Sequence, residues 1–130
     1  MKLEQVAEFC EGLANVTIGF KWNNKTWMIG ERGFVWERPL SKADIKRFGD
    51  ATPPSGDIVG IVTENLDAKD VLLSMGLPGF FTIEHFNGYP AVLVELRNAH
   101  VRDVKAAIRS AYQCVSAMSQ PKKRKPKKKR

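Results

Sequence analysis

The most chemically distinctive residues of this chain are eight basic side chains gathered in its last ten positions. The segment 121–130 reads PKKRKPKKKR and contains no acidic residue. Cations at this density suit a polyanion, because each one neutralises a phosphate and releases its condensed counterions. We therefore predict that the segment contacts nucleic acid phosphates without reading base sequence. The predicted contacts are Lys122, Lys123, Arg124, Lys125, Lys127, Lys128, Lys129 and Arg130.

Charge is divided unequally between this segment and the rest of the chain. The 130 residues include 21 Lys and Arg against 14 Asp and Glu, which gives a net charge of +7. Without the eight basic residues, 13 basic and 14 acidic residues remain, which is a net charge of −1. The basic character of the protein therefore belongs to the segment 120–130, called the tail below.

The composition of the tail predicts disorder in the free protein. It has no apolar side chain to bury, and Pro121 and Pro126 interrupt any helix. Two other interpretations of the tail stay open: a solubilising segment with no dedicated partner, and a ligand for an acidic protein or an anionic membrane. A membrane is disfavoured because lysines without an apolar face give only reversible attraction.

A second group of basic and aromatic residues alternates around a predicted turn at Asn23-Asn24. A two-stranded ribbon of this kind fits a DNA groove and can wedge an aromatic ring at a base step. The alternative is that the tryptophans pack in the core and the lysines are solvated. The group comprises Lys21, Trp22, Lys25, Trp27 and Arg32, and we predict Lys21, Trp22, Lys25 and Arg32 as nucleic acid contacts.

Motifs typical of enzymes and metal sites are absent from the sequence. The two histidines, His85 and His100, lie far from the spacing that a zinc site needs. There is no GxSxG, P-loop or GxGxxG motif. We therefore predict no catalytic residue, no metal, no cofactor and no small-molecule substrate. A deep pocket lined by converging polar groups would reopen the question of an enzyme.

The length and composition predict one intracellular domain with an appendage. No apolar run approaches the length that spans a bilayer, and the N-terminus has acids where a signal peptide is apolar. The two cysteines, Cys10 and Cys114, are expected to be reduced, buried thiols on helices. His85 is expected on a strand, partly buried. Arg102, Lys105 and Arg109 are expected on the solvated face of the last helix.

Hydrophobic periodicity and turn residues predict an α+β fold. A first amphipathic helix covers 3–14, with Glu4, Glu8 and Glu11 opposite its apolar stripe. Ser41 and Asn65 are predicted to cap two further helices. The order is α-βββ-α-β-α-ββ-α, a mostly antiparallel sheet packed by helices. The predicted strands are 16–22, 26–30, 34–37, 58–63, 80–86 and 91–96, and the last helix is 101–118.

Two segments give the chain a family resemblance. They are GFVWERPLSKADI at 33–45 and FFTIEHFNGYPAVLV at 80–94, and the last helix adds Ser-Ala-Tyr at 110–112. Over residues 3–118 the chain resembles the MmcQ/YjbR family of bacterial proteins, especially its actinobacterial branch. The resemblance implies a CyaY-like α/β sandwich, similar to the double-wing domains in which a sheet meets the duplex, and a DNA-binding role. The hairpin FKWNNKTWMIG and the lysine-rich tail depart from the usual family pattern.

The resemblance to frataxin-like folds also suggests iron binding as an alternative, because such folds can bind iron through an acidic ridge. The first helix has only three glutamates, which we interpret as a solvated face.

We predict a globular domain at 1–119 and a disordered tail at 120–130. The predicted function is a non-enzymatic, cytoplasmic, nucleoid-associated protein that binds duplex DNA largely without sequence specificity. The tail would contact phosphates and the domain would orient the complex. The alternative is a protein-interaction module whose tail docks on an acidic partner.

Overall fold

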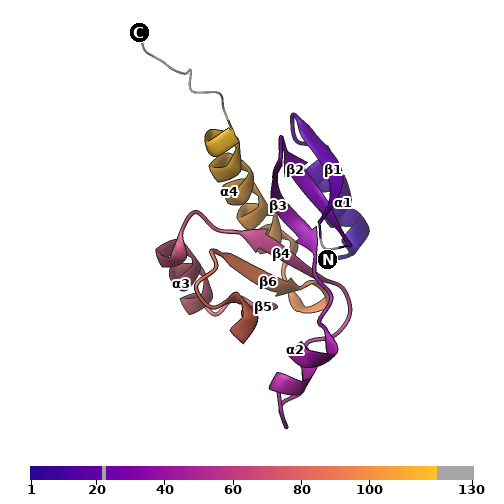
Figure 1. Cartoon of the computed structure of the whole chain (residues 1–130), viewed down its shortest axis with the longest axis vertical. Coiled ribbons are helices and arrows are strands. Elements are labelled where there is room, and N and C mark those ends of the chain that lie inside the picture. Colours follow the sequence, from indigo (N-terminus) through magenta and orange to yellow (C-terminus); the bar gives the residue numbers. More distant parts are fainter. Residues whose placement is uncertain (22, 120–130) are drawn as a thin grey trace.

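A single antiparallel sheet organises the computed structural model, which describes residues 1–21 and 23–119 (Figure 1). Its six strands lie in the order β1-β2-β3-β4-β6-β5. The predicted α+β class and element order are confirmed. The strands are β1 (Val16–Lys21), β2 (Asn24–Ile29), β3 (Arg32–Glu37), β4 (Ile58–Val62), β5 (Phe80–Phe81) and β6 (Ala91–Glu95); the α-helices are α1 (Leu3–Glu11), α2 (Lys42–Arg47), α3 (Leu66–Ser74) and α4 (Val101–Ser119).

The first three strands form the predicted meander with small shifts at its turns. Asn23 has φ of 66°, a left-handed conformation that asparagine tolerates, and it precedes β2. Gly30, with φ of 60°, makes the turn into β3, which begins at Arg32. β2 and β3 therefore each start two residues earlier than the sequence pattern predicted, whereas β1 starts at Val16 as predicted.

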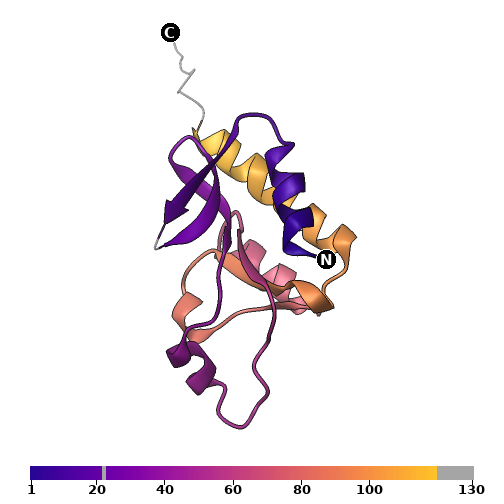
Figure 2. The ribbon, with the colours of Figure 1, turned by 90° about the vertical axis from the view of Figure 1, so that its right-hand side faces the viewer.

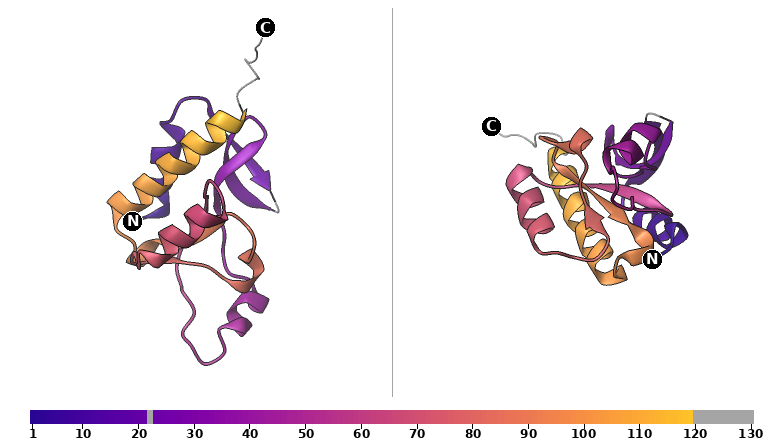
Figure 3. Two further views of the ribbon diagram at one scale, coloured as in Figure 1. Left: turned by 90° about the vertical axis from the view of Figure 1, so that its left-hand side faces the viewer. Right: turned by 90° about the horizontal axis from the view of Figure 1, so that it is seen from below.

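The main hydrophobic core lies between one face of the sheet and the helices α1, α3 and α4. Trp27, Val35 and Ile61 face it from three neighbouring strands, and Val104 and Ile108 face it from α4. Figure 3 shows α3 and α4 together on this side. The indole of Trp27 is fully buried, and its Nε1 donates a hydrogen bond to the Glu11 carboxylate at 3.0 Å. Trp27 is thus a core residue, as one of the two interpretations held.

A second, smaller apolar cluster lies on the opposite face of the sheet. Trp36 and Leu93 belong to it, because their neighbours Val35 and Val92 point into the main core and side chains alternate along a strand. This face is covered by α2 and by the turn around Phe86 rather than by long helices. Figure 2 shows α2 at the end of the molecule opposite the C-terminal end of α4.

Both predicted helix caps are present. The Ser41 hydroxyl accepts a hydrogen bond from the Asp44 N–H, and the Asp44 carboxylate accepts one from the Ser41 N–H, which completes a reciprocal capping box on α2. The Asn65 side chain accepts from the Ala68 N–H at 2.8 Å at the start of α3.

The predicted strand 80–86 is wrong after its first two residues. β5 ends at Phe81, and Glu84–Phe86 form a 3₁₀ turn. In that turn Ile83 and Phe86, three residues apart, both reach the second cluster. His85 is therefore exposed instead of alternating with buried residues on a strand. Local periodicity could not reveal this, because the β-branched and aromatic residues of the segment are equally typical of a strand.

The two thiols also differ from the expectation. Cys10 and Cys114 are free, but only Cys10 is fully buried, and Cys114 is half-buried.

In the part of the chain that the structure describes, none of the helices is both long and apolar enough to cross a bilayer. The whole tail and Trp22 lie outside the described residues, as does the predicted domain boundary at 119/120.

Candidate functional site

A pocket of about 550 Å³ opens on the face of the sheet that carries the second cluster. This size is in the usual range for small-molecule and cofactor sites. We call it the aromatic pocket. Its lining comes from the tip of the first hairpin, from the segment that joins β3 to α2, and from the turn before β6. The lining residues are Asn24, Trp36, Arg38, Pro39, Leu40, Ser41, His85, Phe86 and Tyr89.

Three aromatic side chains form one wall of the aromatic pocket. The rings of Trp36 and Phe86 stack with centroids 6.3 Å apart, and Tyr89 meets Phe86 edge-on at 5.7 Å. Trp36 and Phe86 are buried, while 46% of Tyr89 is exposed. The two buried rings therefore support a third ring that solvent reaches.

Gly60 on β4 gives the indole of Trp36 its position. The two residues are partners across β3 and β4, and a Cβ at Gly60 would lie 2.5 Å from Cε2 and Cζ2 of Trp36. Only a residue without a side chain lets the indole lie flat on β4.

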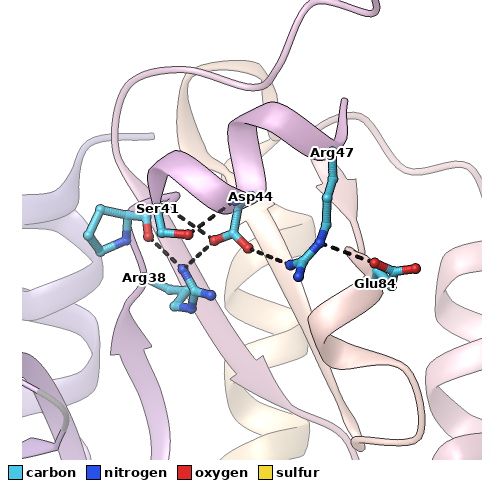
Figure 4. A network of polar contacts seen from close by, with 6 residues as sticks. Arg38, Ser41, Asp44, Arg47 and Glu84 are labelled. Carbon is cyan, nitrogen blue, oxygen red and sulfur yellow. Dashed lines mark hydrogen bonds and ion pairs between the residues drawn. The ribbon is translucent and has the colours of Figure 1, made fainter. Parts of the chain in front are cut away.

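A polar network lies beside the pocket and ties α2 to the turn around Phe86 (Figure 4). Arg38 Nη1 lies 3.1 Å from Asp44 Oδ2, and Arg47 bridges Asp44 at 3.7 Å and Glu84 at 3.1 Å. The guanidinium of Arg38 also lies over the ring of Phe86 at 5.6 Å. Through these contacts, the two sides of the pocket are held together by charge as well as by packing.

Asp44 is the centre of this network and is almost fully buried. Burial alone would raise the pKa of its carboxyl group, but hydrogen bonds from Ser41 and the charge of Arg38 outweigh it. The pKa of Asp44 is therefore lowered from its ordinary value. The carboxylate stays ionised and keeps Arg38 in place at neutral pH.

Lys69 of α3 binds the backbone of the turn around Phe86. Its ammonium group is buried and donates hydrogen bonds to the carbonyls of Phe86 at 2.6 Å and Tyr89 at 2.8 Å. Burial lowers the pKa of Lys69, and the charge of Asp70 opposes that change. The backbone that presents two of the pocket rings is thus clamped by a charged donor.

The pocket reopens the question of an enzyme, and its polar groups bear on the answer. The hydroxyl of Ser41 already accepts the capping hydrogen bond of α2, and Arg38 is paired with Asp44. The ring of His85 lies 6.2 Å from the ring of Phe86. None of the described lining residues is acidic. Two of the polar lining groups, Ser41 and Arg38, are therefore already engaged by protein partners.

The predicted nucleic acid contacts of the hairpin lie on two sides of the ribbon. The ammonium of Lys21 donates to the carbonyl of Glu31 at 3.0 Å, next to the exposed Arg32. Lys21 also lines a small cleft of about 70 Å³ that shares Trp36 and Tyr89 with the aromatic pocket. Lys25 lies instead 3.8 Å from Glu11 and over the ring of Trp27, toward α1. The other contacts predicted, Trp22 and the eight tail residues, lie outside the described residues.

The basic residues of α4 pack largely against α1. Lys105 and Arg109 place their charged groups 5.3 Å and 5.1 Å from the ring of Phe9, while Arg102 is exposed. Over residues 1–21 and 23–119, no cluster of three or more His, Cys, Asp or Glu side chains is arranged to hold a metal ion.

Sequence reasoning missed the aromatic pocket and most of its residues. Trp36, Arg38, Phe86 and Tyr89 were not singled out as site residues. A signal was nevertheless present, because the two segments that carry the family resemblance, 33–45 and 80–94, supply nearly all of the pocket lining. Their meeting in space depends on β3 and β6 both pairing with β4.

Comparisons with known proteins give relatives whose printed names assign no activity. The chain is 43% identical over 89 residues to the uncharacterized proteins Mb2600 of Mycobacterium bovis and MT2646 and Rv2570 of Mycobacterium tuberculosis. Each match covers 66% of this chain and 68% of the relative. No protein-family model matches the chain.

A solved structure shares the fold. The crystal structure of a protein from Pseudomonas syringae matches with a TM-score of 0.66 and 11% identity, over 88% of this chain and 99% of that one. At this identity the likeness concerns the fold alone.

Proposed function

The chain belongs to the family of the mycobacterial protein Rv2570, and we propose that it is a DNA-binding protein. The tail contacts the phosphates of duplex DNA largely without sequence specificity, and the globular domain orients the complex. The protein acts without catalysis, in the cytoplasm at the nucleoid.

The unequal charge distribution carries this proposal. Eight basic residues lie within the last ten positions, whereas the rest of the chain has a net charge of −1. A polyanion is the partner that such a segment binds best, because counterion release grows with each phosphate that is neutralised.

The domain offers a surface that fits the second part of the proposal. Lys21 lies on the face of the sheet opposite the main core, where it lines a cleft with Trp36 and Tyr89, and Arg32 is exposed at the start of β3. Sheet faces and ribbons of this size enter DNA grooves in other proteins. We further propose that the family of Rv2570 is a branch of the MmcQ/YjbR family, whose members are described as DNA-binding.

The proposal is tested by duplex binding across a salt series. The full chain is compared with a full-length variant in which all eight basic tail residues are changed to glutamine. If about six tail cations contact phosphates, log K falls with log salt with a slope near −5, and the variant loses most of that slope. Equal affinity and slope for both proteins would show that the tail is not the anchor. Failure of both to bind duplex at low salt would end the DNA hypothesis.

The alternative partner is an acidic protein. It predicts a saturable complex that the tail variant loses and that nuclease treatment leaves intact, whereas a DNA complex is lost after nuclease treatment.

A further inference from the structure

The aromatic pocket has no role in phosphate binding by the tail, and its composition points to a different part of a nucleic acid. We propose that it receives one unpaired DNA base, so that the protein holds single-stranded or locally opened DNA. This inference rests on the proposed DNA-binding function and adds a second kind of contact to it.

The ring geometry fits a planar heterocycle. Tyr89 is 46% exposed at the pocket, and it is backed by the buried pair of Phe86 and Trp36. A ring that is both accessible and rigidly supported is what base stacking requires, and every base offers a π-face to it. The clamp of Lys69 on the carbonyls of Phe86 and Tyr89 fixes the backbone that carries these rings.

The polar groups around the rings fit the edge of a base. Asn24 lines the pocket from the hairpin tip, and a side-chain amide offers both a donor and an acceptor to a base edge. Its position at the tip brings the hairpin and the pocket within reach of one ligand. A fatty chain would leave these polar groups without partners.

The charges around the pocket fit a phosphate-linked ligand. No acidic residue is among its described lining residues, and the charge of Arg38 in its wall is balanced by Asp44. Lys21 lines the adjoining cleft, which shares Trp36 and Tyr89 with the pocket, so a base on Tyr89 would bring its backbone near an ammonium group. The volume of about 550 Å³ accommodates a whole nucleotide.

A base inside a duplex cannot reach such a pocket, because pairing and stacking hold it in the helix. The proposal therefore predicts different contacts for duplex DNA and for DNA with unpaired bases. Duplex DNA is bound by the tail and oriented by the domain without the pocket, and a strand with unpaired bases gains the contact with the pocket.

The test compares two 12-nucleotide strands that carry the same phosphates. One strand is oligothymidine and the other is abasic throughout, and fluorescence anisotropy measures binding of each to the full-length chain at one moderate salt concentration. Phosphate contacts are common to both strands, so the ratio of their Kd values isolates the contribution of the bases. We expect the chain to bind oligothymidine about fivefold or more tightly, as a single stacked base contributes.

Three variants of the full-length chain assign the preference to the pocket. Tyr89→Ala is expected to bind both strands equally, and Tyr89→Phe is expected to retain the preference because it keeps the ring. Phe20→Ala removes another exposed aromatic ring, on β1 and outside the pocket lining, and is expected to retain the preference as well.

The outcomes separate this inference from the proposed function. If the unaltered chain binds both strands equally well, the tail contacts phosphates but the pocket takes no base. The inference is also overturned if the preference survives Tyr89→Ala or is lost equally in Phe20→Ala. If the chain binds thymidine monophosphate but neither strand nor duplex, the pocket serves a free nucleotide and both proposals fail.

Discussion

The two faces of the sheet are covered in different ways. On one face, the helices α1, α3 and α4 close a core that contains Trp27, Ile61 and Ile108, all fully or almost fully buried. On the other face, short elements cover a small cluster around Trp36 and leave the aromatic pocket open. Long helices supply continuous apolar stripes that fill the space over a sheet, whereas turns expose backbone that needs polar partners. The larger apolar core thus lies on one face, and the proposed binding site on the other.

The difference extends to what holds each face together. The main core relies on apolar packing, with few charged groups involved. The pocket side relies on Asp44, Arg38 and Lys69, whose charged groups are paired or hydrogen-bonded near or below the surface. Such contacts fix geometry more than they add stability.

Truncation of a core residue on the helix-covered face should have the largest effect on stability. Ile108→Ala removes a fully buried side chain and is expected to lower the free energy of unfolding by about 3 kcal/mol. Urea unfolding measures this. Tyr89→Ala, on the pocket side, is expected to cost less than about 1 kcal/mol because the ring is 46% exposed. Similar costs for the two variants would remove the distinction between the faces.

A change at Gly60 tests how the pocket side is packed. Gly60→Ala would place a Cβ 2.5 Å from the indole of Trp36, so the ring must move, at a cost of about 2 kcal/mol. Urea unfolding and tryptophan fluorescence report the cost and the movement. Gly12→Ala is the matched control, because a Cβ there meets only ordinary contacts at 3.4 Å. An unchanged stability for Gly60→Ala would mean that the indole has room to spare.

The charged network predicts an acid-sensitive contribution that the main core lacks. Because the pKa of Asp44 is lowered in the folded chain, its contribution is present above the ordinary carboxyl pKa of about 3.9 and is lost as pH falls through the folded value. Asp44→Asn should cost about 2 kcal/mol at pH 7, and less as the solution is acidified.

Urea unfolding at several pH values checks this behaviour. The exposed Asp50→Asn serves as control and should stay within about 0.5 kcal/mol of the unaltered chain. A difference between Asp44→Asn and the unaltered chain that does not shrink on acidification would show that the carboxylate charge is irrelevant there.

The smallest effect concerns thiol reactivity and leaves stability unchanged. Burial in the main core, with a further contribution from the charge of Glu11, raises the pKa of Cys10 to about 12. Burial also raises the pKa of the half-buried Cys114, with a contribution from Glu64. At pH 8 a disulfide reagent should modify Cys114 slowly and Cys10 only on unfolding. Modification of Cys10 at the faster rate would show that the main core opens readily.

Much of the fold could be predicted because its signals are local. The apolar stripe of α4, the caps Ser41 and Asn65 and the alternation in the first three strands each depend on residues close in sequence. The segment 80–86 could not be predicted in the same way. Its residues are typical of a strand, but only the sheet decides that β5 ends at Phe81 and that Phe86 turns inward.

The sequence alone determined the charge distribution, the element order and the two segments that carry the family resemblance. Charge and periodicity are properties of the chain itself, so no coordinates are needed to read them. Tertiary structure alone decided that Trp36 and Tyr89, 53 positions apart, share a pocket, and that Lys21 and Lys25 face opposite ways. Pairing across β3, β4 and β6 creates these neighbours, and strand register is a long-range choice that local pattern does not contain.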